Sequence, residues 1–455
     1  MTIEPIKRTN LPPGPKARFI FDTLAKFNRD PFGFLMSCAK EYGDIVYLPN
    51  LQLSGSGVYI LNHPDFIETV LGANSSHFRK PHNAMGSYKR LFGNGIIVSE
   101  GDVWRRQRRL LQPAFHRERI ATYANIMVDY TNRMLARWQY SEIRDISHEM
   151  GRLITEIIAK TLFDIDLVGK GKEVDSALTE ILKYFARRTS TRTVALLDNF
   201  PTPGNLRYKK AVQRLETIIS SIIEQQRASG EDRGNLLSML INIQDEDGRH
   251  MTNQQLLDEV KNLFLAGNDT TAQVLTWSLY LLSQHPEIEA KLAVELQSAP
   301  TSLTFEDLPR LHYTEMIVME AMRLYPPAWL IGRTVIRECE IGEYLLPVGA
   351  LIMISQWVVH RDPLYFDQPE VFNPDRWADG LAKRIPTYAY FPFSSGPRVC
   401  IGRSFAMMGV VLLLATIARK FKLTLAPGQK VTLWPSIPLR PKNGLNMLLS
   451  KVEVG

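Results

Sequence analysis

The chain has 455 residues, of which 45% are hydrophobic, so it is long enough to bury a large core. The 54 Lys and Arg against 47 Asp and Glu give a formal charge of +7, spread along the chain without a basic run interleaved with aromatic residues, which argues against a nucleic-acid-binding protein. The three cysteines, Cys38, Cys339 and Cys400, form no CxxC pair, which argues against a disulfide framework or a structural zinc site.

The first stretch, MTIEPIKRTNLPPGPKARF, contains no apolar run of signal-peptide length. No later stretch approaches the roughly 20 uncharged residues that a membrane span needs. Repeats, low-complexity segments and Pro/Gly/Ser linkers are not evident either. We therefore expect a soluble, monomeric cytoplasmic protein that forms a single domain over residues 1–455, without a fused reductase.

Strand signals occur in two places far apart in the sequence. DIVYLPN and SGVYILN lie near the start, and CEIGEYLLPVGALIMIS follows much later, from Cys339. Helical patterns dominate the remainder. We predict a mainly α fold with a small β region, in which the early strands pair with the late ones.

Two helical stretches carry charged residues on one face. In GDVWRRQRRLLQPAF, Trp104 and Arg108 lie about one turn apart, and in TEMIVMEAMRLYPP the i,i+3 pair is Glu320 and Arg323. Taken alone, the first pattern also suits a basic amphipathic helix with a packed tryptophan. The second also suits an ordinary surface ion pair.

A long helix is predicted from Thr252 to His285, about 50 Å at 1.5 Å per residue. Thr252 and Gln255 have capping-box spacing at its start, and Pro286 marks its end. Its middle, LFLAGNDTTAQVLTW, is apolar on more than one face, so we expect it to be buried centrally. Its few polar residues are then costly and candidates for function, although Asp-Thr-Thr in a helix is also typical of a cap or a solvated face.

The loop from Phe393 to Gly402, FSSGPRVCIG, places a cysteine between glycines and before an apolar helix. Gly396 and Gly402 permit a tight turn, and Arg398 and the helix N-terminus stabilise a thiolate at Cys400. A thiolate can bind a metal or attack an electrophile. Two alternatives remain: a small buried thiol, or a nucleophile whose base comes from a distant residue, since the nearest histidine in the sequence is His360.

The pattern FxxGxRxCxG, present as Phe393, Gly396, Arg398, Cys400 and Gly402, resembles the haem-binding loop of the cytochrome P450 monooxygenases. Other stretches agree in the family's order, from PPGP near the start to SIPLRPKNGL near the end. They are the (A/G)Gx(D/E)T(T/S) motif at 266–271, the ExxR pair with Arg376 in VFNPDRW, the WxxxR pair, and Arg333 after the Pro326-Pro327 break. The resemblance implies the cytochrome P450 fold, with the long central helix over the haem.

The resemblance also implies a role for each of these residues. Cys400 would be the axial thiolate of haem b, the metal ligand, with Phe393 and Gly402 beside the cofactor. The propionates would be bound by Trp104, Arg108, Arg333 and Arg398. Asp269 and Thr270 would deliver protons, Gly267 would leave room for dioxygen, and Glu320, Arg323 and Arg376 would be structural.

The reaction implied is insertion of one oxygen atom from dioxygen into a C–H or double bond of a hydrophobic substrate. The expected pocket residues are mainly apolar: Phe264, Leu265, Ala266, Ala328, Trp329, Leu330, Ile331 and Ile437. The chain is similar in style to the fatty-acid hydroxylases and their soluble bacterial relatives. A fatty acid would use a cation such as Lys89 or Arg90, while a terpenoid or other neutral lipid remains an alternative substrate.

Electrons would come from a separate ferredoxin or flavodoxin with its reductase. Arg105, Arg106, Arg109 and Arg403 are candidates for a basic face that receives it, or are simply solvated. Three other functions remain open: a peroxide-driven peroxygenase, a thiolate-haem isomerase, and a non-catalytic haem- or lipid-binding protein. The intact Asp-Thr pair favours the monooxygenase.

Overall fold

The computed structural model describes residues 11–16, 20–49, 56–81, 89–165, 176–177, 180–181, 184, 202–231 and 234–452. The chain divides into two compact units. The first contains the described residues of Met1–Met85, Ala328–Val371 and Gly380–Cys400, and the second contains those of Gly86–Pro327, Phe372–Asp379 and Ile401–Gly455. The single domain over 1–455 stays a prediction.

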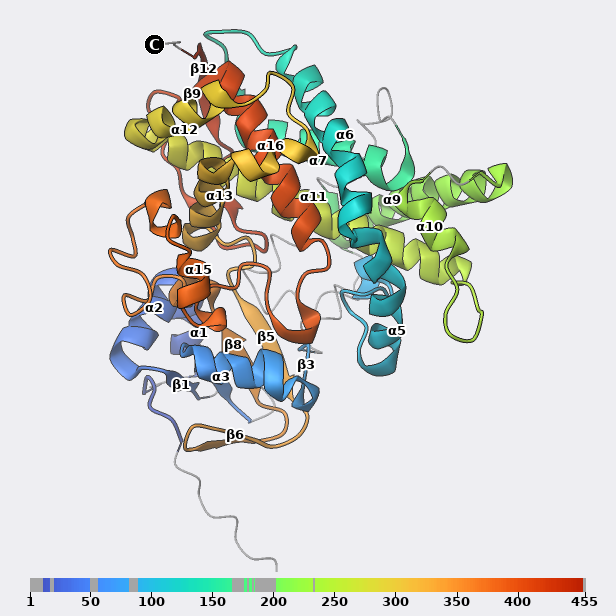
Figure 1. Ribbon diagram of the computed structural model, residues 1–455. Helices are drawn as coiled ribbons and strands as arrows, with labels where there is room; N and C mark the ends of the chain where they lie inside the picture. The colour runs from blue at the N-terminus through green and yellow to red at the C-terminus, as the bar shows by residue number, and fades with distance from the viewer. Residues whose placement is uncertain are drawn as a thin grey trace, which may run out of the picture. The chain divides into compact units, whose positions relative to one another are not determined.

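The first unit is built on a five-stranded sheet of order β1-β2-β8-β5-β3 (Figure 1). The strands are β1 (Ile45–Leu48), β2 (Val58–Leu61), β8 (Leu351–Ile354), β5 (Ile331–Val335) and β3 (Phe78–Arg79). β2 and β8 pair in parallel, with Val58 opposite Leu351, and the other neighbours pair antiparallel. The predicted pairing of early with late strands is therefore confirmed.

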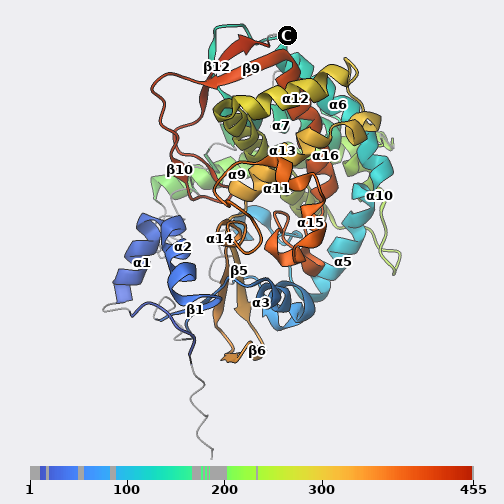
Figure 2. The same cartoon turned by 60° about the vertical axis from the view of Figure 1, so that its left-hand side comes forward.

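Short helices and a two-stranded ribbon complete this unit, and two views show α1 and α2 beside β1 (Figures 1 and 2). The elements are α1 (Ile20–Arg29), α2 (Pro31–Tyr42), α3 (Pro64–Glu68), the π-helical turn η1 (Thr69–Ala73), η2 (Ser75–His77), β6 (Cys339–Ile341), β7 (Tyr344–Leu346), α14 (Gln356–Val359), α15 (Leu381–Arg384), η7 (Thr387–Ala389) and η8 (Gly396–Arg398).

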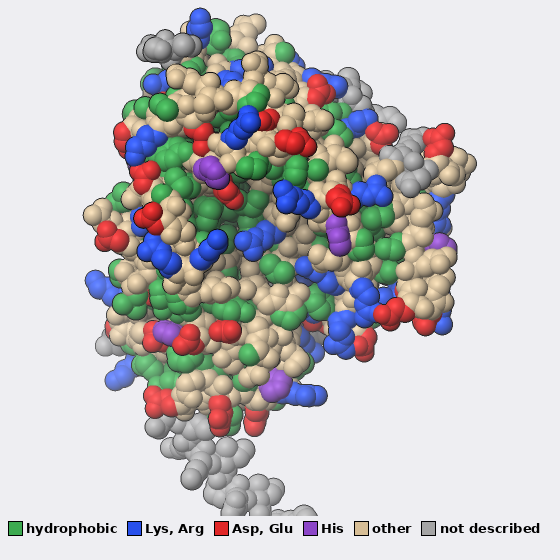
Figure 3. Space-filling view, viewed as in Figure 1, with side chains coloured by type: hydrophobic (Ala, Val, Ile, Leu, Met, Phe, Trp, Pro, Cys, Tyr) green, Lys and Arg blue, Asp and Glu red, His purple; other side chains and the backbone are tan. Residues whose placement is uncertain are grey.

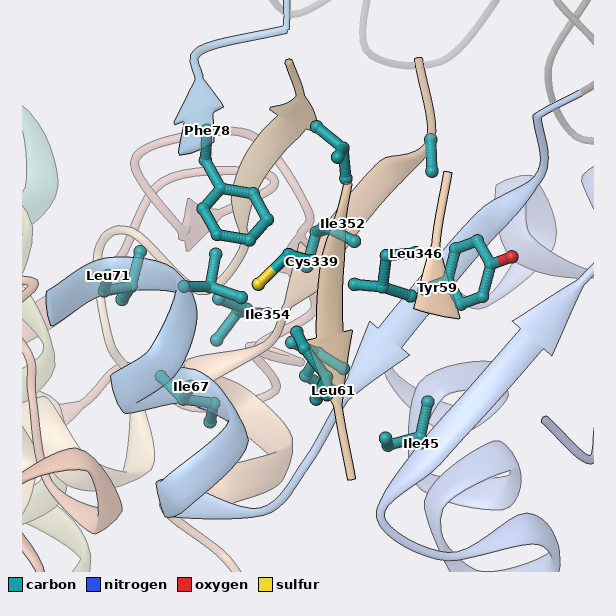
Figure 4. Close-up of a cluster of buried hydrophobic side chains, with 14 of the residues drawn as sticks. Ile45, Tyr59, Leu61, Ile67, Leu71, Phe78, Cys339, Leu346, Ile352 and Ile354 are labelled. Atoms are coloured by element: carbon teal, nitrogen blue, oxygen red, sulfur yellow. The ribbon is translucent and has the colours of Figure 1, made fainter. Parts of the chain in front are cut away.

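One face of the sheet packs into an apolar core (Figure 4). Leu61, Ile352 and Ile354 point from the strands toward Ile67 of α3, and all four are fully buried. Burying a side chain of this size contributes about 1.5–3 kcal/mol. Cys339 lies inside the same cluster and packs there as a small buried side chain.

The second unit is mostly helical. Its helices are α5 (Gly101–Leu111), η3 (Gln112–Phe115), α6 (Arg117–Leu135), α7 (Ile146–Phe163), α9 (Pro203–Ser229), α10 (Leu236–Asn242), α11 (Asn253–Gln284), α12 (Pro286–Ser298), η5 (Phe305–Arg310), α13 (His312–Leu324), η6 (Pro374–Trp377) and α16 (Arg403–Lys420). Two small sheets accompany them: β4 (Ile143–Asp145), β12 (Asn446–Lys451) and β9 (Phe421–Leu425), and the pair β10 (Leu433–Trp434) and β11 (Arg440–Pro441). The predicted fold class, mainly α with a small β region, is confirmed.

Helix α11 runs through the centre of this unit and packs against α7, α9, α13 and α16. It begins as predicted, with the Thr252 side chain accepting a hydrogen bond from the Gln255 backbone N–H at 3.1 Å. The second half of the expected capping box is replaced, because the Gln255 side chain accepts from Arg106 instead. The helix is buried over most of its length, with Trp277 only 1% exposed.

A buried carboxylate joins α13 to η6. Glu320 accepts two hydrogen bonds from Arg323, at 2.8 and 2.9 Å, and one from Arg376 Nε at 2.9 Å. The indole N–H of Trp377 and the backbone N–H of Asn373 donate to it as well. Glu320 and Arg323 are both 0% exposed. The predicted ExxR pair and its later arginine therefore come together as one network, in which every carboxylate oxygen is hydrogen-bonded.

We expect Glu320→Gln to lower the free energy of unfolding by about 3–5 kcal/mol, because it leaves two buried guanidinium groups without their counter-charge. Urea unfolding followed by circular dichroism measures this. Glu315→Gln, on the exposed face of the same helix, is the matched control and should change stability by about 0.5 kcal/mol or less. Equal effects of the two substitutions would contradict the structural role of the network.

Candidate functional site

The cysteine loop lies at the end of the first unit. Cys400 is exposed, whereas Cys38 and Cys339 are buried. Gly396 has a φ of +69°, and a Cβ there would lie 1.9 Å from the carbonyl oxygen of Leu71, so the tight turn requires glycine. The Cys400 backbone N–H donates to the Phe393 carbonyl at 2.9 Å, and α16 begins three residues later. The loop thus presents a sulfur just before a helix N-terminus.

Two buried side chains hold the chain before this loop: Gln356, which the sequence analysis did not single out, and His360, the histidine nearest to Cys400 in the sequence. Gln356 Nε2 donates to the Phe391 carbonyl at 2.6 Å, and the Phe391 N–H donates to His360 Nε2 at 3.1 Å. Gln356 and His360 are both 0% exposed. His360 is thus engaged with the backbone by one ring nitrogen, which argues against its use as the base for a nucleophilic cysteine.

The proposed propionate ligands are distributed over both units. In the first unit, Arg398 lies in η8 and Arg333 in β5, and Arg333 Nη1 donates to the carbonyl of Gly332 at 2.9 Å. In the second unit, Trp104 and Arg108 lie on α5, one turn apart, as the spacing predicted. All four side chains are half-buried. Their role toward a cofactor stays a prediction.

Two glycines have environments that differ from the expectation. Gly402 has a φ of −87°, and a Cβ there would meet only Phe115, at 3.8 Å, so the turn does not require glycine at this position. A Cβ on Gly267 would lie 3.1 Å from Ile158 Cδ1 of α7. Gly267 therefore allows α7 and α11 to pack closely, and its predicted role of leaving room for dioxygen stays a prediction.

Away from its exposed ends, α11 is most accessible in its middle. Ala266 is exposed, and Asp269 and Thr270 are half-buried. Thr270 Oγ1 donates to the Ala266 carbonyl at 2.7 Å, the local hydrogen bond that the sequence suggested. Thr276 makes the same bond to Ala272 but is 0% exposed. What distinguishes Thr270 is accessibility.

Asp269 forms an ion pair with Arg440 of β11 and accepts a hydrogen bond from Gln273 at 3.4 Å. Its side chain is 16% exposed. Burial raises the pKa of Asp269 above the usual value of an aspartate, while Arg440 and Gln273 act in the opposite direction. The carboxyl therefore combines a raised pKa with a charged partner, a combination suited to proton exchange.

Each unit, taken by itself, carries residues of the kinds that bind a haem. The first unit offers an exposed thiol, the donor that haem-thiolate iron requires, and half-buried arginines, the donors that propionates require. The second offers a glycine with space beside it, at Gly402, and a helix that exposes Ala266 among otherwise buried residues. Among the residues that the structure describes, there is no group of three or more His, Cys, Asp or Glu arranged to bind a metal.

The expected substrate contacts divide into two groups. Leu265, Ala328, Leu330 and Ile331 are half-buried, and Ile437 is 42% exposed, so all five are available to a ligand. Trp329 is only 4% exposed and its ring lies 4.8 Å from that of Phe32, while Phe264 is 3% exposed and lies 6.0 Å from Phe163. These two rings are packed in the cores of their units, and their pocket role stays a prediction.

The predicted basic face on α5 is partly neutralised. Arg105 pairs with Asp102, Arg106 with Asp245 and Arg109 with Glu246. In the space-filling view, basic and acidic side chains stand side by side over this helix (Figure 3). Any electrostatic attraction of an acidic partner by these three arginines is therefore weaker than their number alone indicates.

The first turns of α11 hold a backbone loop by three side chains that the sequence analysis also passed over. Asp258 accepts from the Asn94 N–H at 2.9 Å, Glu259 from the Ile96 N–H at 3.0 Å, and Asn262 from the Ile97 N–H at 3.0 Å. The signal was present, since a helix predicted to be buried carries four polar residues within the five positions 258–262. The loop leads directly into α5, so this contact also sets where α5 starts.

Glu259 is 0% exposed, and one of its oxygens, Oε1, is without a hydrogen-bond partner among the described residues. Burial raises the pKa of Glu259 to about 8; the nearby Asp258 adds to the shift and the Ile96 N–H opposes it. At neutral pH the carboxyl is therefore mostly protonated. Ionisation above that range places an unpaired charge in the core.

Because the folded-state pKa of Glu259 lies above the unfolded value, the stability it contributes is present at low pH and is lost as pH rises from about 4.5 through about 8. We expect wild type to lose stability relative to Glu259→Gln between pH 5.5 and 8.5, on the order of a few kcal/mol at about 1.4 kcal/mol per pH unit. Urea midpoints at both pH values measure the difference. Glu118→Gln, at an exposed site on α6, should show the same change of stability with pH as wild type. If the stability of wild type and of Glu259→Gln changed equally with pH, the raised pKa of Glu259 would be ruled out.

Comparison with known proteins places these features in one family. Residues 12–445 match the protein-family model for cytochrome P450. The chain is 37% identical over 415 residues to cyclooctatin synthase of Streptomyces melanosporofaciens, covering 90% of this chain and 89% of that protein. It is 31% identical over 406 residues to pentalenene oxygenase of Streptomyces avermitilis, covering 89% of each. A crystal structure of the cytochrome P450DA haem domain, 22% identical, matches the fold with a TM-score of 0.86 over 97% of this chain and 98% of that one.

Proposed function

The chain belongs to the cytochrome P450 family and is a monooxygenase of the oxidoreductase class, and we propose that it oxidises a terpenoid, with electrons from a separate redox partner. The observation that carries the choice of substrate is the similarity to two terpene oxygenases over nine-tenths of the chain. A fatty acid, toward which the sequence analysis leaned, is the second candidate. Lys89 and Arg90, the cations proposed for its carboxylate, are exposed.

The cofactor of this family is a haem bound through a thiolate, and we propose haem b with Cys400 as the ligand. When bound, it supplies the activation of dioxygen that no amino-acid side chain provides. Cys400 is the cysteine suited to this role, because it alone of the three is exposed. Burial raises the pKa of Cys38 to about 12, which keeps that thiol protonated.

The protein's own residues have three tasks in this proposal. Arg398, Arg333, Trp104 and Arg108 bind the propionates, with Phe393 and Gly402 beside the ring. Leu265, Ala266, Ala328, Leu330, Ile331 and Ile437 contact the substrate and exclude water from it. Asp269 gives protons inward through the hydroxyl of Thr270 and is reloaded from water.

A ferredoxin or flavodoxin with its reductase is proposed as the electron donor. Arg403 is exposed at the first residue of α16 and, with the partly paired arginines of α5, is a candidate contact for an acidic partner. Among the described helices, none is long and apolar enough to span a membrane. The cytoplasmic location and the monomeric state stay predictions.

The central test is the difference spectrum of the reduced protein under carbon monoxide. We expect a Soret band strongly red-shifted relative to that of a histidine-ligated haem, because a thiolate donates electron density to the iron. Cys400→Ser should abolish this band and Cys38→Ala should retain it. A histidine-like band in wild type, or the same band in Cys400→Ser, would remove the basis of the proposed function.

The substrate proposal is tested on the same haem-loaded protein. Polycyclic terpene hydrocarbons and alcohols are titrated against fatty acids of equal carbon number, and the spin-state change of the haem band gives the dissociation constants. Tighter binding of the terpenes, together with an oxygenated terpene product in a reconstituted reaction, is the expected result. Binding confined to the fatty acids would assign the enzyme to the second candidate.

A further inference from the structure

The segment that carries Arg440 is fixed along α11 by backbone contacts. The indole N–H of Trp277 donates to the Leu439 carbonyl at 3.0 Å, and the Leu439 N–H donates to the Pro327 carbonyl at 3.0 Å. Leu439 is 0% exposed and Trp277 is 1% exposed, so this anchor is a core contact. Arg440 follows directly and therefore reaches Asp269, two turns back along α11, from a fixed position.

Both oxygens of the Asp269 carboxyl are occupied. Arg440 Nη2 contacts Oδ2, and Gln273 Nε2 donates to Oδ1 at 3.4 Å. Among the described residues, these two are the polar side chains that act on this carboxyl, one from β11 and one from α11 itself. The ion pair is largely buried, with 22% of the Arg440 side chain and 16% of the Asp269 side chain exposed. In such surroundings the charge on one partner strongly governs the state of the other.

We propose that Arg440 is a positioning residue that sets the orientation and the charge of the Asp269 carboxyl, and so controls proton delivery during oxygen activation. The inference rests on the proposed function, in which Asp269 is the proton donor. The sequence analysis assigned Arg440 no role, although Arg440 lies in the SIPLRPKNGL stretch, 171 positions from Asp269.

The proton balance explains why the step benefits from the arginine. When Asp269 gives its proton to Thr270 Oγ1, the hydroxyl passes its own proton inward and stays neutral. The carboxylate left behind lies in a poorly solvated place, where Arg440 stabilises its charge until solvent returns a proton to it. The Nε–H of Arg440 is buried and has no acceptor among the described residues.

Loss of the arginine has a defined electrostatic consequence. Burial raises the pKa of Asp269, and without Arg440 the positive charge that opposes this effect would be lost. Of the two opposing side chains among the described residues, Gln273 alone would remain, and it is a neutral donor. Asp269 would then hold its proton more tightly and rotate more freely. Proton delivery would slow near neutral pH, and the pH range in which it operates would move upward.

The first experiment reads Asp269 without turnover. Infrared titration of the haem-loaded protein locates the carboxyl band that Asp269→Asn removes. In Arg440→Gln the pKa of Asp269 should rise by about one unit or more, the size expected for loss of an adjacent charge. Arg440→Lys, which keeps the charge with poorer geometry, should show a smaller rise. Lys442→Gln, the same charge change at an exposed site of the same segment, should leave the titration unchanged.

The second experiment follows oxygenated product and hydrogen peroxide against pH. Arg440→Gln should form about tenfold less product per electron pair at pH 7 and release more peroxide. The high-pH limb of its product-against-pH profile should move to higher pH, as the pKa of Asp269 does in the infrared titration. Arg440→Lys should recover most of the product. If Arg440→Gln lost the same fraction of product formation at every pH and left the Asp269 titration unchanged, Arg440 would be merely structural and the proposal would be overturned.

The two experiments separate this inference from the function on which it depends. If wild type lacks the red-shifted carbon monoxide band, the proposed function fails and the inference fails with it. If that band and product formation are intact but Arg440→Gln leaves the Asp269 titration unmoved, the positioning role alone is wrong. Should Arg440→Gln not fold, Arg440→Lys alone must shift the titration upward, and an unshifted value overturns the proposal.

Discussion

The second unit depends on one constraint: a charge placed in a low-dielectric core must be matched by donors and counter-charges. Glu320 meets it most completely, since Arg323, Arg376, Trp377 and the backbone of Asn373 all donate to one carboxylate. The network ties α13 to η6, two elements about fifty residues apart. Because each member is satisfied only when the others are in place, the network specifies a single arrangement of this part of the chain.

The same constraint explains the polar residues of α11. Four of them reach a partner on another segment: Asp258 and Glu259 bind backbone N–H groups of the loop before α5, Asn268 binds Thr155 of α7 at 2.7 Å, and Asp269 pairs with Arg440. Most of these contacts are structural. Among these four, Asp269 differs because its partner is a charged side chain, Arg440, and because its neighbours Ala266 and Thr270 are accessible.

The three motif glycines differ in the structural reason for having no side chain. Gly396 is required by its positive φ and by the Leu71 carbonyl against it. Gly267 is explained by close packing on Ile158, and Gly402 by neither backbone conformation nor a protein neighbour closer than 3.8 Å. One motif position therefore reflects backbone geometry, another reflects helix packing, and the third is consistent with a group outside the polypeptide.

The sequence by itself determined the helical class, the long helix to within one residue at each end, the pairing of early with late strands, and the family, because these depend on periodicity, caps and ordered motifs. It also placed Glu320, Arg323 and Arg376 in one group. Only the tertiary structure decided that Trp329 and Phe264 are core residues and that the α5 arginines are paired. It alone also showed that Gln356, Glu259 and Arg440 contact Phe391, Ile96 and Asp269, respectively. These depend on contacts between residues far apart in the chain, and local sequence patterns carry no information about which distant side chain will meet them.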